Sequence, residues 1–240
     1  MNVLSAAPHS RMTFKDAVRV QHSALTGLER RTLQWMARRL PPSIHSDHLT
    51  LLALFAMVGA GLSYWLASVT TVGLWLVILC LAVNWFGDSL DGTVARVRQQ
   101  QRPRYGYYVD HIVDAVGTLC LFGGLALSGY MAPAVAAALT IAYFLVCLEV
   151  YLAAHSLGEF HMSFLGVGPT ELRILLAIGN LTLLVHPIAA IGGHEFRLFD
   201  VGGVIGALGL AGTFAWSSIR HTRALYLAEP RPAAAEDPRS

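Results

Sequence analysis

Long apolar segments separated by short polar connections dominate the hydropathy pattern of the chain. A helix that crosses the hydrocarbon of a bilayer needs about 20 predominantly apolar residues. Six segments approach or reach this length, so the pattern predicts six transmembrane helices. They cover approximately Leu49–Val69, Val72–Phe86, Ile112–Met131, Ala132–Ala154, Leu172–Val185 and Val201–Trp216.

The second and fifth of these segments are short, but each is continuous with polar sequence that also favours a helix. The second continues from Asp88 to Arg96, and the fifth begins with Pro169 and includes Arg173. Because charged groups are costly in lipid, these polar ends should line a cavity walled by protein. We therefore predict an all-α integral membrane protein with six transmembrane helices.

Residues 12–39 carry basic side chains and apolar side chains near helical periodicity, among them Leu33, Trp35 and Met36. This pattern is typical of an amphipathic helix that lies in the cytoplasmic membrane interface, ahead of the six spans. The alternative is an ordinary solvated helix packed on the bundle. We predict the interfacial helix.

Three regions follow from these patterns. Residues 1–46 form a cytoplasmic segment with the amphipathic helix, and residues 47–223 form the six-span domain. Residues 224–240 are rich in Pro, Ala and charge, and we expect them to form a disordered cytoplasmic tail.

Composition and charge support a membrane protein and orient it. Of the 240 residues, 55% are hydrophobic and only 13% are charged, which is outside the range of ordinary soluble domains. Only Arg197, of 17 Lys and Arg residues, falls in a connection on the side opposite the termini. By the positive-inside rule, both termini are cytoplasmic.

Four aspartates stand at helical spacing beside the apolar segments. Asp88 and Asp91 are three residues apart, and Asp110 and Asp114 are four apart, so each pair projects from one helix face. A charge at the bilayer centre costs about 2.5–3.5 kcal/mol, so four carboxylates need cations beside them. Carboxylate oxygens suit Mg²⁺ or Mn²⁺, and two such ions can clamp a diphosphate.

Small residues accompany the carboxylates. Gly92 and Ala95 leave a helix stripe without bulk, Arg96 extends this stripe, and Gly106 precedes Asp110 by one turn. A ligand can press against such a stripe, and an arginine can present a fork of donors to its phosphate.

The complete pattern resembles the signature of the CDP-alcohol phosphotransferases, integral membrane enzymes of phospholipid synthesis. It reads Asp88-x2-Asp91-Gly92-x2-Ala95-Arg96-x9-Gly106-x3-Asp110-x3-Asp114. The segment Ser46–Thr50 also resembles the family's Pro-Asn-x-x-Thr opening of the first span, with Asp47 where Asn is usual and no adjacent Pro.

The resemblance implies roles for these residues. The four aspartates would bind two divalent cations, Mg²⁺ or Mn²⁺, and Asp114 would also be the general base. The nucleotide-binding residues would be Asp88, Gly92, Ala95, Arg96 and Gly106.

The implied activity is transfer of a phosphatidyl group from CDP-diacylglycerol to a small polar alcohol, with release of CMP. The alternative within the family is transfer of phosphocholine or phosphoethanolamine from a soluble CDP-alcohol to diacylglycerol. A carboxylate-lined cation transporter or an inactive scaffold are the alternatives outside it. The resemblance also implies a homodimer. By the positive-inside rule the carboxylate motif opens toward the cytoplasm, and we expect a place in the bacterial inner (plasma) membrane and no nucleic-acid partner.

Polar residues near the fourth and fifth spans are candidates for the acceptor site. They are Glu149, His155, Glu171 and Arg173. A Glu149 buried in the membrane needs a partner, for which Arg173, His155 or a cationic alcohol would serve. Each of these residues could equally belong to a structural ion pair or a wetted loop end.

Overall fold

The computed structural model describes residues 18–20, 26–157, 159–161 and 169–229. Its helices are α1 (Thr26–Arg39), α2 (Ser46–Ala67), α3 (Val72–Val97), α4 (Pro103–Leu127), α5 (Pro133–Ser156), α6 (Pro169–Leu183) and α7 (Leu198–Ala228). Its strands are β1 (Val18–Val20), β2 (Glu159–His161), β3 (Ile188–Ile191) and β4 (His194–Arg197).

Five of the described helices are long and apolar enough to cross a membrane, namely α2, α3, α4, α5 and α7. The chain is thus a multi-pass membrane protein. Helix α6 has only 15 residues, which is fewer than the roughly 20 that a perpendicular crossing requires. The sixth span therefore remains a prediction, whereas α3 does continue through its polar end as expected.

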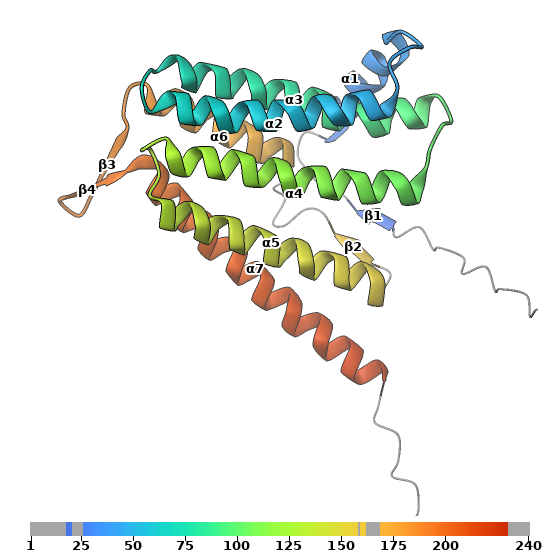
Figure 1. The fold of residues 1–240 in the computed structure, drawn as a ribbon. Helices are drawn as coiled ribbons and strands as arrows, with labels where there is room; N and C mark the ends of the chain where they lie inside the picture. The colour runs from blue at the N-terminus through green and yellow to red at the C-terminus, as the bar shows by residue number, and fades with distance from the viewer. Residues whose placement is uncertain (1–17, 21–25, 158, 162–168, 230–240) are drawn as a thin grey trace, which may run out of the picture.

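The five long helices lie side by side in the order α3, α2, α4, α5 and α7 (Figure 1). Helix α2 contacts both α3 and α4, α6 lies on α3, and α5 lies between α4 and α7. The main core contains Tyr64, Leu74 and Leu125 and sits toward the end away from α1. Asn180 of α6 donates to the Tyr64 hydroxyl at 2.8 Å, so the Asn180 amide nitrogen and the Tyr64 hydroxyl oxygen are paired inside this core.

Glycines let α2 and α4 touch backbone to backbone. A Cβ on Gly61 would overlap the Cys120 carbonyl, and one on Gly124 would overlap the backbone of Gly61. Small residues are the usual contacts between helices in lipid, where close packing replaces the hydrophobic effect as the force between them. This contact aligns α4 with α2 and hence with α3.

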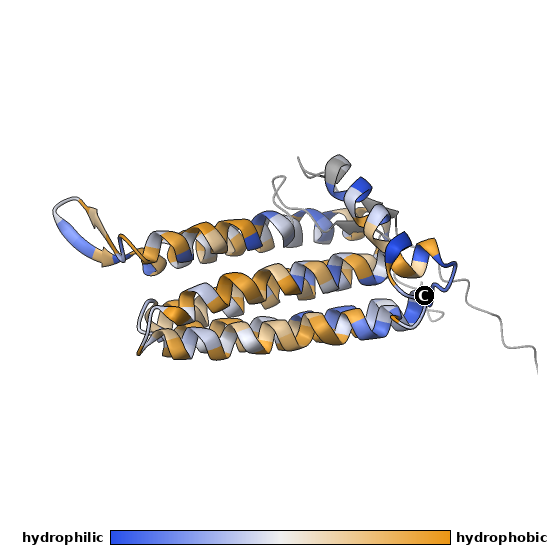
Figure 2. Cartoon of the chain, turned by 90° about the horizontal axis from the view of Figure 1, so that it is seen from above, coloured by the Kyte–Doolittle hydropathy of each residue, from blue (hydrophilic) through white to orange (hydrophobic). Residues whose placement is uncertain are grey.

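Two short strand pairs were not predicted. Strand β1 pairs in parallel with β2, and β3 pairs with β4 in an antiparallel hairpin. Gly192 and Gly193 turn this hairpin with φ of 59° and 82°, which is left-handed backbone that favours glycine. Figure 2 shows the hairpin projecting from the end of the molecule opposite α1, with hydrophilic residues concentrated toward the α1 end.

Helix α1 packs on the bundle. Leu33 and Ala37 are buried with Leu90 and Val94 of α3, whereas Trp35 lies on the opposite, exposed face. The apolar face is therefore used against protein, and an interfacial position of α1 remains a prediction. The predicted helical stretch before Thr26 lies outside the described residues, apart from strand β1.

The C-terminal boundary also differs from the expectation. Helix α7 continues to Ala228, past the predicted end of the six-span domain at residue 223. The rest of the predicted disordered tail, from residue 230 onward, lies outside the described residues.

Candidate active site

The first half of the motif lies on the last turns of α3. Because this helix continues unbroken to Val97, Asp88 and Asp91 are on adjacent turns of one surface. The hydroxyl of Thr50, at the start of α2, donates to Oδ2 of Asp91 at 2.7 Å, and the Gly92 amide donates to Oδ1 of the same carboxylate. Both oxygens of Asp91 thus have donors from the protein.

The close approach of α2 and α3 depends on Gly87, the residue before Asp88. A Cβ at this position would lie 2.6 Å from the Leu49 carbonyl oxygen and 2.9 Å from the Ala53 amide nitrogen. These are backbone atoms, so they cannot move aside without moving the helix. The contact brings Thr50 within reach of Asp91.

The second half of the motif lies on α4 and faces the first. Asp88, Asp110 and Asp114 each offer a carboxylate oxygen, and the three oxygens lie within 4.8 Å of one another. Carboxylate oxygens are ligands that Mg²⁺ takes, with waters completing its octahedron. The donor set and spacing therefore fit a hard divalent cation.

Asp91 is not part of this group of three. It is close enough to Asp88 and Asp110 to interact with them electrostatically, and Asp114 interacts with all three of the other aspartates. Like charges at this spacing repel, so the site favours any cation that enters it. Whether Asp91 completes a site for a second ion remains a prediction.

Arg173 of α6 supplies positive charge to the carboxylates. Its Nη2 donates to Oδ2 of Asp88 at 2.6 Å, and its Nε donates to the Asn84 side-chain oxygen at 2.7 Å. Asn84 in turn donates to the Ala53 carbonyl at 3.0 Å. The side chains of Arg173 and Asp88 are only 15% and 23% exposed, so water screens this pair weakly. A hydrogen-bonded chain thus links α6, α3 and α2.

The remaining acceptor-site candidates are more dispersed. Glu149 of α5 pairs with Nδ1 of His221 on α7 at 2.5 Å, so its partner is neither Arg173 nor His155, as the sequence suggested. His155 is exposed on the last turn of α5, and Glu171 is half-buried in the first turn of α6. Arg173 contacts a motif carboxylate directly, whereas Glu149 belongs to the contact between α5 and α7.

The small residues of the motif border open space. A Cβ on Gly92 would meet only the movable guanidinium of Arg96, at 3.2 Å, and one on Gly106 would meet nothing within 4 Å. Ala95 lines a cavity of about 490 Å³ together with Val94 and with residues of the start of α2 and of the α3–α4 connection. Arg96 donates to Thr93 at 3.1 Å, one turn back on the same helix.

Two arginines of the α3–α4 connection form contacts with the α1–α2 connection and with the start of α2. The guanidinium of Arg98 donates to the carbonyl oxygens of Leu40 at 2.9 Å and Ile44 at 2.6 Å, in the connection between α1 and α2. Arg102 forms an exposed ion pair with Asp47, which raises the pKa of the arginine. These contacts position the start of α2, which carries Thr50.

Comparison with known proteins identifies the family. The model of the CDP-alcohol phosphatidyltransferase family matches residues 44–215 of the chain. The protein belongs to this family. The match includes the complete carboxylate motif and the helices that position it. A search of curated proteins finds no significant match to the chain.

Membership indicates a membrane transferase of phosphate-containing groups in phospholipid synthesis. The motif residues were predictable because they stand at the fixed spacing of the family signature. Asn84 and Gly87, which the sequence analysis did not select, lie next to the motif in the same helix. Thr50 was visible as part of the opening of the first span, but its role at Asp91 depends on the packing of α2 against α3.

Proposed function

We propose that this phosphatidyltransferase family member transfers a phosphatidyl group from CDP-diacylglycerol to a small polar alcohol and releases CMP. The observation that supports this most directly is the convergence of Asp88, Asp110 and Asp114 at one end of a membrane bundle. A carboxylate group of this kind fits the divalent cations on which diphosphate chemistry depends.

The nucleotide would lie along α3, where Gly92 and Ala95 border open space and Arg96 can direct its donors to a phosphate. Gly106 would border the same ligand from α4. Asp88, Asp91, Asp110 and Asp114 would hold two divalent ions, Mg²⁺ or Mn²⁺. Bound there, these ions would neutralise charge on the diphosphate and on the leaving group.

A residue of the chain, Asp114, would accept the proton of the attacking hydroxyl. The acceptor hydroxyl oxygen attacks the phosphorus that bears the diacylglycerol, and its proton passes to a carboxylate oxygen of Asp114. A new phosphorus–oxygen bond forms as the bond to the CMP oxygen breaks, and CMP leaves with that electron pair. Arg173 would hold Asp88 in place during this step and, with Glu171, face the acceptor.

We further propose that the site and both termini are cytoplasmic in the bacterial inner membrane, because basic residues gather at this end. A homodimer is part of the same proposal and is an expectation from the family.

The test is direct. Purified protein is incubated with CDP-diacylglycerol, Mg²⁺ and separately serine, inositol phosphate, glycerol phosphate, choline or ethanolamine, and CMP and lipid products are identified. We expect CMP release with one of these alcohols, and none from Asp91→Asn. If transfer occurs only from CDP-choline or CDP-ethanolamine to diacylglycerol, the proposed donor is wrong. If Asp91→Asn releases CMP at the wild-type rate, the proposed role of the motif is wrong.

A further inference from the structure

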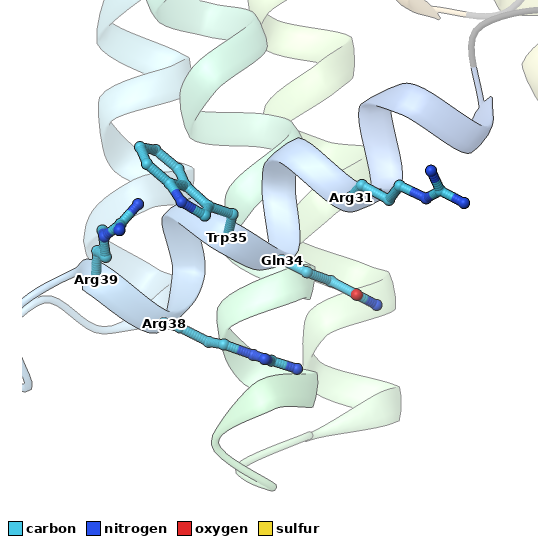
Figure 3. Close-up of a pocket in the computed structure, with 5 residues that line it drawn as sticks. All are labelled: Arg31, Gln34, Trp35, Arg38 and Arg39. Atoms are coloured by element: carbon cyan, nitrogen blue, oxygen red, sulfur yellow. The ribbon is translucent and has the colours of Figure 1, made fainter.

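The outer surface of α1 contains a pocket that the transfer reaction does not use. Arg31, Gln34, Trp35, Arg38 and Arg39 line it, and we call it the α1 arginine pocket (Figure 3). Its volume is about 330 Å³. Four of these residues stand at positions i, i+3, i+4 and i+7, so they share one face of the helix.

The opposite face of α1 fixes the helix in place. Leu33 and Ala37 are buried against α3. Glu29 accepts hydrogen bonds from the indole of Trp85 on α3 at 2.9 Å and from the hydroxyl of Thr170 on α6 at 2.8 Å. The pocket is therefore presented by a helix that two other helices hold.

The pocket is strongly cationic. Helix α1 contains four arginines and one glutamate, and that glutamate is Glu29, which faces α3 and α6 instead. In the described part of the chain, no acidic side chain forms an ion pair with Arg31 or Arg38, and both are exposed. A ligand for this surface must carry negative charge.

An aromatic ring is part of the same surface. The Arg39 guanidinium lies 3.8 Å from the centroid of the Trp35 ring, and Trp35 is 58% exposed. Figure 3 shows the Trp35 ring beside Arg39 at one edge of this face and Gln34 and Arg38 extending along its other edge. Tryptophan beside arginine at the end of membrane-spanning helices is typical of the headgroup region, where the ring meets lipid and the cation meets phosphate.

We propose that the α1 arginine pocket binds the phosphate headgroup of an anionic phospholipid in the leaflet on the α1 side of the membrane. Arg31 and Arg38 would contact the phosphate, and Trp35, held by Arg39, would pack on the glycerol and upper acyl region. Helix α1 packs on α3, which is long and apolar enough to span the membrane, so the pocket lies on a helix that contacts a candidate span. The proposal requires membrane insertion but not the proposed reaction.

The experiment measures lipid binding to the purified full chain in a zwitterionic detergent. Phosphatidylglycerol, phosphatidylcholine and inorganic phosphate are added separately, and retention is counted by native mass spectrometry alongside the thermal unfolding midpoint. The test variants are the double change Arg31→Gln with Arg38→Gln, and Trp35→Leu. The single changes Arg31→Gln and Arg38→Gln are made as well, and Arg30→Gln is their matched control, because it also removes one charge but from an exposed position of α1 that does not line the pocket.

We expect phosphatidylglycerol to bind wild-type protein and the double variant to bind it about 30-fold more weakly, because each basic residue near an anionic surface contributes about fivefold. Trp35→Leu should weaken binding less, and Arg30→Gln should not. If Arg30→Gln weakens binding as much as Arg31→Gln or Arg38→Gln does, the lipid is attracted by the overall positive charge of α1 and not bound by the pocket, and the proposal is overturned. Equal stabilisation by inorganic phosphate, or equal binding of phosphatidylcholine, would also overturn the proposal, and unchanged binding by the double variant would remove the site.

Discussion

At the residue scale, the motif aspartates differ in what holds them. Thr50 and the Gly92 amide satisfy Asp91, and Arg173 holds one oxygen of Asp88. A carboxylate held by donors at a defined position is oriented, whereas a freely rotating one loses entropy each time it binds. The different partners therefore support different roles within one motif.

Asp114 is the residue for which a proton-transfer role can be separated from ion binding. In Asp114→Asn the other three carboxylates and Arg96 remain, so donor binding should persist while turnover falls by about 100- to 10,000-fold, the usual contribution of a general base. CMP release gives the turnover, and metal-dependent thermal stabilisation by the donor gives the binding. An equal loss of both would make Asp114 chiefly an ion ligand.

Arg173 is expected to matter most when no divalent ion is present. Arg173→Gln leaves Asp88 without its ion-pair partner, and we expect the metal-free protein to lose about 1–3 kcal/mol of stability, below the range for a fully buried pair because the site is partly exposed. Added Mg²⁺ should restore more of the unfolding midpoint in this variant than in wild type. Arg173→Lys, which keeps the charge, is the control and should lie between them. A metal-free midpoint equal to wild type would contradict this role.

At the scale of elements, the site depends on how closely α3 approaches α2. Gly87 permits backbone contact with Leu49 and Ala53, and this contact places Thr50 beside Asp91. Asn84 adds a hydrogen bond across the same contact. The helix pair therefore determines the positions of the α3 carboxylates more than their own sequence neighbours do.

Gly87→Ala should separate the two helices. Its Cβ meets backbone atoms, and such overpacking typically costs about 1–3 kcal/mol. Gly92→Ala is the matched control, because its Cβ meets only a movable guanidinium and should leave the unfolding midpoint unchanged while weakening donor binding. Thermal unfolding in detergent compares the two, and equal midpoints would show that α2 and α3 do not need this contact.

At the scale of the whole molecule, the carboxylates of α3 and α4 repel each other unless a cation joins them. Because Asp88, Asp110 and Asp114 come from two helices, an ion that binds all three links those helices only in the folded state. Ligands that bind only the folded state stabilise it by mass action. Divalent cations should therefore stabilise the entire bundle.

Mg²⁺ or Mn²⁺ at about 100 times its dissociation constant should add about 2.7 kcal/mol of stability, and a chelator should remove it. Unfolding midpoints with and without the ion measure this, with Ca²⁺ and K⁺ as comparison ions. Asp110→Asn should reduce the gain. A gain of the same size in a variant with all three aspartates replaced by asparagine would place the ion elsewhere.

Local patterns in the chain were sufficient to predict the class of protein and the residues of its motif. Apolar length predicts membrane helices without tertiary information, because the solvent they meet is lipid wherever they pack. Fixed spacing on a helix places Asp88 with Asp91, and Asp110 with Asp114, because helical geometry is local. The family resemblance rests on the same local pattern, and the match to residues 44–215 confirms it.

Which polar residues contact one another could be learned only from the packing of the helices. Glu149 pairs with His221, Arg173 with Asp88, and Thr50 with Asp91, at sequence separations of 72, 85 and 41 residues. Such pairs depend on which helices are neighbours and on how closely glycines let them approach, and neither is encoded in local spacing. The exposure of Trp35 has the same cause. Trp35 belongs to the apolar pattern of α1, but that pattern does not reveal that α3 covers the face of Leu33 and Ala37 and leaves Trp35 outside.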